Sequence, residues 1–209
     1  FNGTAILFVG TSPDRLETFL LDKTVVLNPG VYYYITPMLS TAQISIATTD
    51  DTQIVPTDTK NRPEGIVSHI EPNYIYTLFY HEKERGFRFK GESHDFWELT
   101  YVDTGTMYNQ VDGRTYRMAQ GELMFFAPGQ FHSQWADPDV SVCYITLTFS
   151  MDFSDRELLS HRVFPGDNKL RQLLSDILKE QRKNQIYSDD LILCYLKQLV
   201  IHIIRSRKI

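Results

Sequence analysis

Short apolar runs recur at close spacing through the middle of the chain, with turn residues between them. They lie at 75–80, 87–89, 96–102, 106–111, 115–118, 123–126 and 140–149. Runs this short and regular predict the strands of a sandwich or barrel. Asp112-Gly113 separates two of them and predicts a hairpin, because both central positions of a type I′ turn need positive φ.

After Phe149 the apolar period becomes helical. One helical face is predicted from Leu170, Leu173, Leu174, Ile177 and Leu178, with Asn168 or Asp167 as the cap. A second helix, 191–204, is apolar nearly all round, apart from a thin stripe of Gln198, His202 and Arg205. Such a helix needs burial on several sides. Packing on the barrel supplies one side, and a second subunit is the alternative for another.

The first sixty residues give a mixed pattern. Ser12-Pro13-Asp14 predicts a helix start, followed by an apolar stripe of Leu16, Phe19 and Leu20. Apolar runs at 24–27, 31–35 and 44–47 predict strands, the first two joined by a turn at 28–30. Residues 57–64 are almost entirely polar and predict a linker.

These patterns predict a mainly β protein in three parts. Residues 1–60 form a small α+β segment of unknown role, residues 66–155 a barrel, and residues 156–209 a two-helix segment for packing or dimerisation. A chain of 209 residues can bury such a core without disulfides.

The formal net charge of −5 argues against binding to a phosphate backbone, which draws its affinity from clustered Lys and Arg. Cys143 and Cys194, the two cysteines, are far apart in apolar surroundings, which favours reduced thiols and a cytoplasmic location. No membrane-length apolar run and no leader pattern occur, so we expect no membrane partner. A start without Met and an end after an apolar helix lead us to expect a piece of a longer protein.

Polar residues interrupt one predicted strand at alternate positions. Residues two apart share a face of a strand, so Glu92, His94, Phe96, Glu98 and Thr100 are predicted to point one way. Trp97, Leu99 and Tyr101 then point the other way. Two carboxylates and an imidazole are costly in an ordinary core, and a wet lumen removes that cost.

Two segments resemble the motifs of the cupin superfamily. His94, Glu98 and Gly105 match the first motif, with Glu92 in place of its first His. Gly121 followed by Pro128, Gly129 and His132 resembles the second, with Ala127 in place of a proline. The resemblance implies a cupin double-stranded β-helix barrel.

More narrowly, residues 91–102, 121–123 and 128–132 resemble the effector domain of AraC/XylS-type transcription regulators, and the two-helix tail is similar to the family's dimerisation segment. The likeness covers about residues 70–207. It implies a sensor in which a small molecule, often a sugar or another metabolite, controls paired helix-turn-helix modules. We expect such a module after Ile209, and no DNA binding by this chain itself.

The candidate effector-binding residues are the polar groups and aromatics at lumen positions. They are His94, Glu98, His132, Glu92, Phe96, Tyr108, Phe131 and Trp135. The resemblance implies no cofactor; if a metal binds, His94, Glu98 and His132 are its ligands, and a hydrogen-bonded polar pair is the alternative for His94 and Glu98. No nucleophile-and-base arrangement is legible, so the sequence favours a binding domain over its rival, a metal-dependent isomerase or dioxygenase.

Overall fold

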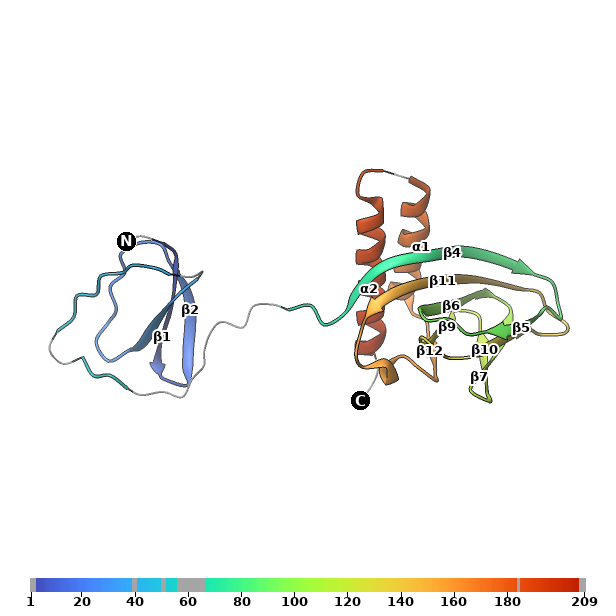
Figure 1. Ribbon diagram of the computed structural model, residues 1–209, viewed down its shortest axis with the longest axis horizontal. Coiled ribbons are helices and arrows are strands. Elements are labelled where there is room, and N and C mark those ends of the chain that lie inside the picture. The colour runs from blue at the N-terminus through green and yellow to red at the C-terminus, as the bar shows by residue number, and fades with distance from the viewer. Residues whose placement is uncertain (1–2, 39–40, 50–51, 56–66, 184, 207–209) are drawn as a thin grey trace. The chain divides into compact units, whose positions relative to one another are not determined.

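The computed structural model describes residues 3–38, 41–49, 52–55, 67–183 and 185–206 (Figure 1). They divide into two compact units, residues 1–66 and 67–209. Strands make up 45% of the structure and helices 20%, so the prediction of a mainly β protein is confirmed. The predicted linker at 57–64 lies outside the described residues.

The first unit is a three-stranded antiparallel sheet in the order β2-β1-β3. Its strands are β1 (Ala5–Ser12), β2 (Arg15–Leu21) and β3 (Tyr32–Pro37). The helix predicted from Ser12 is wrong, because Ser12 and Arg15 are paired across a two-residue turn and the run that follows is β2. A short apolar run fits either period, and pairing with β1 decided between them.

The described part of this unit contains no helix, and its small core includes Ala5, Leu7 and Leu21. The strand predicted at 31–35 is confirmed as β3, whereas 24–27 and 44–47 are irregular. Leu27 and Ile44 from these irregular segments pack on the core instead of extending the sheet.

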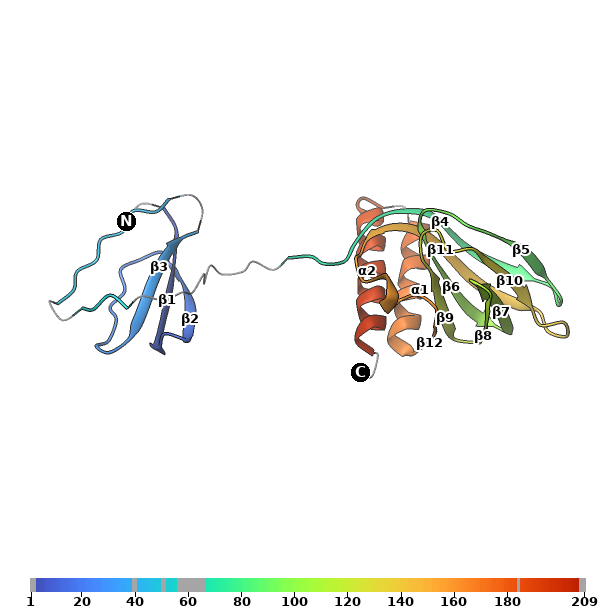
Figure 2. The same ribbon diagram turned by 60° about the horizontal axis from the view of Figure 1, so that its bottom comes forward.

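The second unit contains two sheets that enclose a shared apolar interior (Figure 2). The four-stranded sheet has the order β5-β10-β7-β8: β5 (Arg88–Glu92), β10 (His132–Ala136), β7 (Thr106–Val111) and β8 (Arg114–Ala119). The five-stranded sheet has the order β12-β9-β6-β11-β4: β12 (Val163–Pro165), β9 (Glu122–Phe126), β6 (Trp97–Thr104), β11 (Val142–Asp152) and β4 (Glu71–Lys83).

The predicted cupin-like fold with two C-terminal helices is confirmed, and its hydrogen bonding forms two facing sheets whose edge strands are β5 and β8 in one and β4 and β12 in the other. The interior between the sheets is nevertheless continuous, with Val102 and Met124 of one sheet packed with Met107 and Met118 of the other. The domain is therefore a cupin-like β-sandwich.

The predicted hairpin is confirmed. Asp112 and Gly113 have φ angles of 48° and 80°, and Val111 is paired with Arg114 across them. All seven predicted strand runs are strands in the structure, whereas β10, whose residues are largely polar, and the three-residue β12 were missed.

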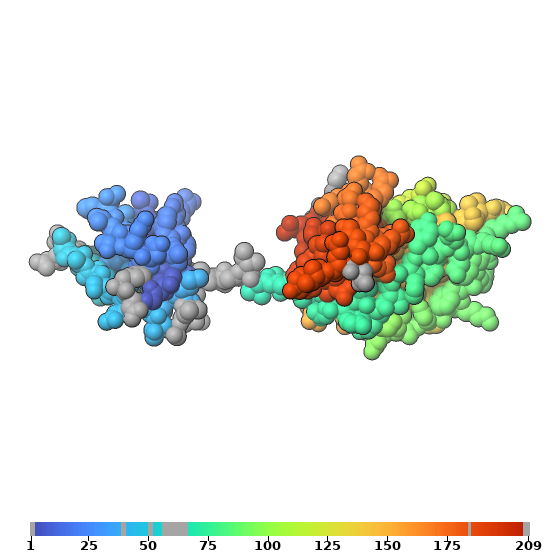
Figure 3. All heavy atoms as spheres, turned by 90° about the horizontal axis from the view of Figure 1, so that it is seen from above, coloured from blue at the N-terminus to red at the C-terminus, as the bar shows by residue number. Residues whose placement is uncertain are grey.

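Both predicted helices are present: α1 (Asn168–Lys183) and α2 (Ser188–Ser206). The Leu170 N–H donates to Asp167 Oδ1 at 2.8 Å, so Asp167 caps α1. The helices pack on the outer face of the five-stranded sheet, and Figure 3 shows the red atoms of α2 beside the green atoms of β4. No helix within the described residues is long and apolar enough to span a membrane.

Candidate functional site

Residues on β6 alternate between two environments. Trp97, Leu99 and Tyr101 belong to the core that is shared with the helices. Val102 belongs to the interior between the sheets, and Glu98 and Thr100 lie on that same inner face. The predicted separation of faces is confirmed from Trp97 onward.

The prediction that Glu92 to Thr100 share one face of a single strand is wrong, because this segment contains the end of one strand, a connection and the start of the next strand. β5 ends at Glu92 and β6 begins at Trp97, so His94 lies in the connection. Glu92 lies next to His132 because the two residues are paired between β5 and β10. The turn into the connection uses Gly91, whose φ of 115° suits glycine and where a Cβ would lie 2.8 Å from His132 O.

Four polar side chains converge at the mouth of the sandwich, and we call Glu92, His94, Glu98 and His132 the mouth cluster. Glu98 Oε2 lies 3.3 Å from His94 Nε2 and 3.5 Å from His132 Nε2. Glu92 Oε1 lies 3.9 Å from His132 Nε2. The four residues, which the sequence analysis named as candidates, thus lie close together, and strand pairing is what brings Glu92 beside His132.

Both imidazoles are oriented through their Nδ1 atoms. His94 Nδ1 lies 2.9 Å from Phe96 O, and His132 Nδ1 lies 3.1 Å from Gln130 O. A carbonyl only accepts, so Nδ1 carries the proton in each ring, and a neutral ring then presents its Nε2 lone pair to the cluster. His132 is 1% exposed, and its Nε2 has no hydrogen-bond partner within the described residues. This buried Nε2 can therefore accept a hydrogen bond from a ligand or coordinate a cation.

The electrostatics follow from burial and proximity. Burial opposes the charge on Glu98, which is 3% exposed, but His132 and His94 outweigh burial and lower the pKa of Glu98 to about 2. Burial also opposes the charge on His94, while the hydrogen bond and charge of Glu98 raise its pKa above the ordinary value. The cluster therefore favours a carboxylate with a protonated imidazole, or a carboxylate with a bound cation.

The mouth cluster also fits a divalent metal. One ligand atom from each residue can be chosen so that all four lie within 4.8 Å of one another. Ligands at ~2.0–2.2 Å from one ion stand at most ~4.4 Å apart, so small side-chain movements suffice. Two imidazoles with anchored Nδ1 atoms and two carboxylates suit Zn, Fe, Mn or Ni. His94, His132, Glu98 and Glu92 would hold it, and it would supply Lewis acidity to an oxygen ligand.

The inner face continues from the mouth cluster to the open edge at β4. Glu98 is paired with Thr148, which is paired with Thr77, and the two threonine hydroxyls lie 2.6 Å apart. Phe79 and His81 follow on the same face of β4, and Phe79 is 54% exposed. The sequence predicted this strand but did not indicate that one of its faces continues from the mouth cluster. The period-two alternation that begins at Thr77 was the signal that could have shown which residues share this face.

The interior between the two sheets is filled by side chains. Behind the mouth cluster, Met107, Met118, Met124 and Phe126 are completely buried in the interior between the sheets. The Thr100 hydroxyl donates a hydrogen bond to Glu98 Oε1 at 3.2 Å and accepts one from the Gln134 side-chain amide at 3.3 Å. These buried polar groups therefore have hydrogen-bond partners within the protein. The exposed groups next to this filled interior are Glu92 of the mouth cluster, with a side chain 51% exposed, and Phe79 on the inner face of β4.

Among the aromatic candidates, only Phe96 lies against the cluster. Its ring stacks on His94 with centroids 4.0 Å apart and meets Tyr76 at 4.8 Å. Tyr108 and Trp135 stack on each other at 5.7 Å on the outer face of the four-stranded sheet, so their predicted lumen positions are wrong. The reason is alternation, since the buried neighbours His132 and Gln134 turn Trp135 outward.

Phe131, another candidate, is 54% exposed and lies beside Gly91. It belongs to the turn that leads into β10, next to the mouth but outside the interior. Its place is consistent with the rim of a ligand site and not with its wall.

Comparisons with solved structures return low overall similarity. A cupin protein from Bacteroides fragilis has 15% identity and a TM-score of 0.34, over 40% of this chain and 68% of that one. A conserved protein of unknown function from Streptococcus pyogenes has 16% identity and a TM-score of 0.33, over 35% of this chain and 62% of that one.

Oxalate decarboxylase from Bacillus subtilis has 19% identity and a TM-score of 0.32, over 38% of this chain and 22% of that one. The matched regions thus span under two thirds of the Streptococcus protein and under a quarter of the decarboxylase. No curated protein matches the sequence significantly.

A family model gives the decisive comparison. The model of the AraC-like ligand-binding domain matches residues 74–200, which include the sandwich and most of both helices. This confirms the resemblance drawn from the motifs as far as the ligand-binding domain. The chain belongs to the family of AraC-like ligand-binding domains.

Proposed function

We propose that this chain is the effector-sensing and dimerisation part of a bacterial, cytoplasmic AraC-type transcription regulator. A small polar metabolite, such as a sugar, binds at the mouth cluster and alters a helix-turn-helix module carried elsewhere in the protein. The chain itself does not hold DNA, in keeping with its net charge of −5.

The observation that carries this proposal is the unpartnered, buried Nε2 of His132 among three other ligand-type groups. Buried polar atoms without partners are rare, and the half-exposed Glu92 carboxylate lies 3.9 Å from this one. A hydroxyl on the effector would donate to His132 Nε2 or to Glu92. Phe96 and Tyr76 would supply the aromatic faces on which a sugar ring packs.

The test is a thermal-shift and calorimetric screen of the chain with monosaccharides, sugar acids and polyols. A hit is then repeated with His132→Asn and, as the matched control on the outer face, Trp135→Ala. Binding lost in the first variant and kept in the second supports the proposal. Equal binding by all three proteins contradicts a site at the mouth.

Dimerisation through the C-terminal helices is part of the same proposal. Leu191 of α2 is 39% exposed, and Cys194, one turn further along, is exposed as well. A second copy covering this stripe would remove apolar surface from water. Light scattering of the wild type and of Leu191→Asp tests the point, since a dimer that survives this charge does not use the stripe.

A metal-dependent cupin enzyme, an isomerase or dioxygenase, is the second candidate because the donor set of the mouth cluster suits a divalent ion. Elemental analysis of protein purified without added metal separates the two. A stoichiometric ion together with turnover of a substrate would favour the enzyme and contradict the sensor.

A further inference from the structure

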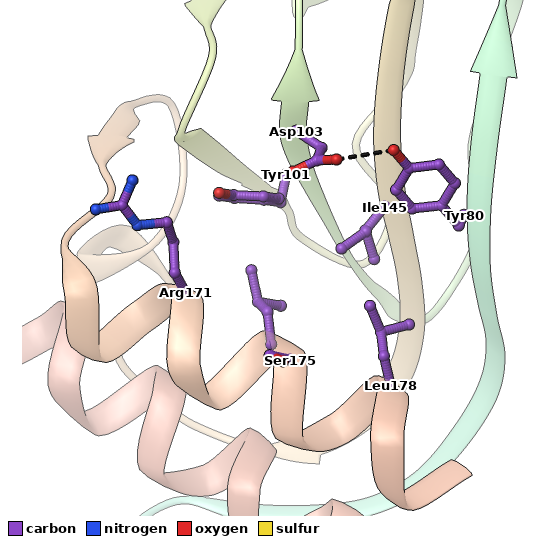
Figure 4. Close-up of a pocket in the computed structure, with 8 residues that line it drawn as sticks. Tyr80, Tyr101, Asp103, Ile145, Arg171, Ser175 and Leu178 are labelled. Atoms are coloured by element: carbon purple, nitrogen blue, oxygen red, sulfur yellow. Dashed lines mark hydrogen bonds between the residues drawn. The ribbon is translucent and has the colours of Figure 1, made fainter. Parts of the chain in front are cut away.

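A second cavity, of about 200 Å³, lies between α1 and the outer face of the five-stranded sheet (Figure 4). Its floor is one row across three strands, since Ile145 of β11 is paired with Tyr80 of β4 and with Tyr101 of β6. Its roof is one stripe of α1, formed by Arg171, Leu174, Ser175 and Leu178. The cavity shares no residue with the mouth cluster.

The helix stripe that roofs the cavity contains one small residue, Ser175. Its hydroxyl makes no hydrogen bond within the described residues. Liquid water occupies ~30 Å³ per molecule, so the cavity has room for a small organic molecule.

Opposite charges line the cavity without pairing with each other. Asp103 Oδ2 accepts a hydrogen bond from Tyr80 Oη at 2.7 Å, which leaves acceptor capacity on the carboxylate. Arg171 donates to Asn168 Oδ1 at 2.5 Å and forms no ion pair with any described residue.

Both charges act electrostatically on the Tyr101 hydroxyl. Burial raises the pKa of Tyr101, Asp103 raises it further, and Arg171 lowers it. Figure 4 shows Arg171 and Asp103 on opposite sides of the Tyr101 ring. A guanidinium and a carboxylate thus flank an apolar floor.

We propose that this cavity binds a small zwitterion with its two charges separated by a short apolar chain. The carboxylate of the ligand faces Arg171, its ammonium faces Asp103, and its chain lies over Ile145 and Leu174. Such a ligand bridges α1 and β6, the strand that also carries Glu98, and stabilises the folded state by mass action. The proposal does not depend on the function proposed for the mouth cluster.

The test is an NMR titration of the chain with γ-aminobutyrate and ε-aminocaproate, beside butyrate and butylamine, which each lack one charge. We expect saturable shifts of the Tyr101 and Ser175 amides with a zwitterion, and at least about tenfold weaker binding of each singly charged compound. No saturable shift with either zwitterion at about 10 mM overturns the proposal.

Variants locate the binding. Arg171→Gln, on the exposed side of α1, removes the carboxylate partner, and Ser175→Leu fills the cavity, so both should weaken binding at least about tenfold. Lys169→Gln removes a positive charge from the same helix outside the cavity and should leave binding unchanged. Unaltered binding by Arg171→Gln contradicts the assignment.

Discussion

Replacing Glu98 by Gln should destabilise the fold in a pH-dependent way. The carboxylate is 3% exposed and lies between two imidazoles, which hold its pKa at about 2 instead of 4.5. At 1.36 kcal/mol per pH unit, this difference corresponds to about 3 kcal/mol of the free energy of unfolding. The amide keeps the shape of the side chain and removes the charge.

The sign of the pH dependence follows from both partners. The folded pKa of Glu98 is lowered, so its stabilisation is complete above about pH 4.5 and is lost as the pH falls toward 2. The folded pKa of His94 is raised above 6.5. Its contribution to the free energy of unfolding is therefore complete below about pH 6.5 and is lost as the pH rises through the raised pKa. The cost of Glu98→Gln should therefore be greatest between about pH 5 and 6.

Urea denaturation of the wild type and of Glu98→Gln, in EDTA at a series of pH values, measures this cost. The matched control is Glu92→Gln, the same chemical change at a half-exposed position of the same cluster, which should cost less than about 1 kcal/mol. A cost for Glu98→Gln that stays constant from about pH 3 to 8, or that stays below about 1 kcal/mol throughout, would refute the coupling of Glu98 to the imidazoles.

Three further changes test other parts of the structure. Asp167→Ala removes the cap of α1 and should lower the free energy of unfolding by about 1 kcal/mol, with the loss fading in acid as the lowered pKa of Asp167 is passed; urea denaturation at two pH values checks this. Leu99→Ala empties a fully buried position under the helices and should cost about 3 kcal/mol by the same assay, so a cost under about 1 kcal/mol would contradict the packing. His132→Asn should weaken binding of added Zn²⁺ at least about tenfold in calorimetry, whereas Trp135→Ala on the outer face should not, and the reverse pattern would contradict a metal site at the mouth.

The local pattern of the sequence determined the elements in the second unit. Alternation and turn residues predicted all of its strands except β10 and β12, the period of leucines predicted α1, and Asp112-Gly113 predicted its hairpin, because each of these signals is read within a few residues. The sequence also indicated which residues form the mouth cluster, since His94, Glu98 and His132 occur at the spacing of the cupin motifs. Local pattern failed after Ser12, where an apolar run compatible with a helix became β2 by pairing with β1.

Only the tertiary structure decided which of these residues face one another. Glu92 joins the mouth cluster through its pairing with His132 on another strand, and Trp135 is turned away from it by the same pairing. The cavity under Ser175 likewise arises from three strands and a helix that are distant in sequence. Strand register and packing are set by contacts between remote segments of the chain. The sequence pattern therefore determined which kinds of side chain are present, and the fold determined which of them lie next to one another.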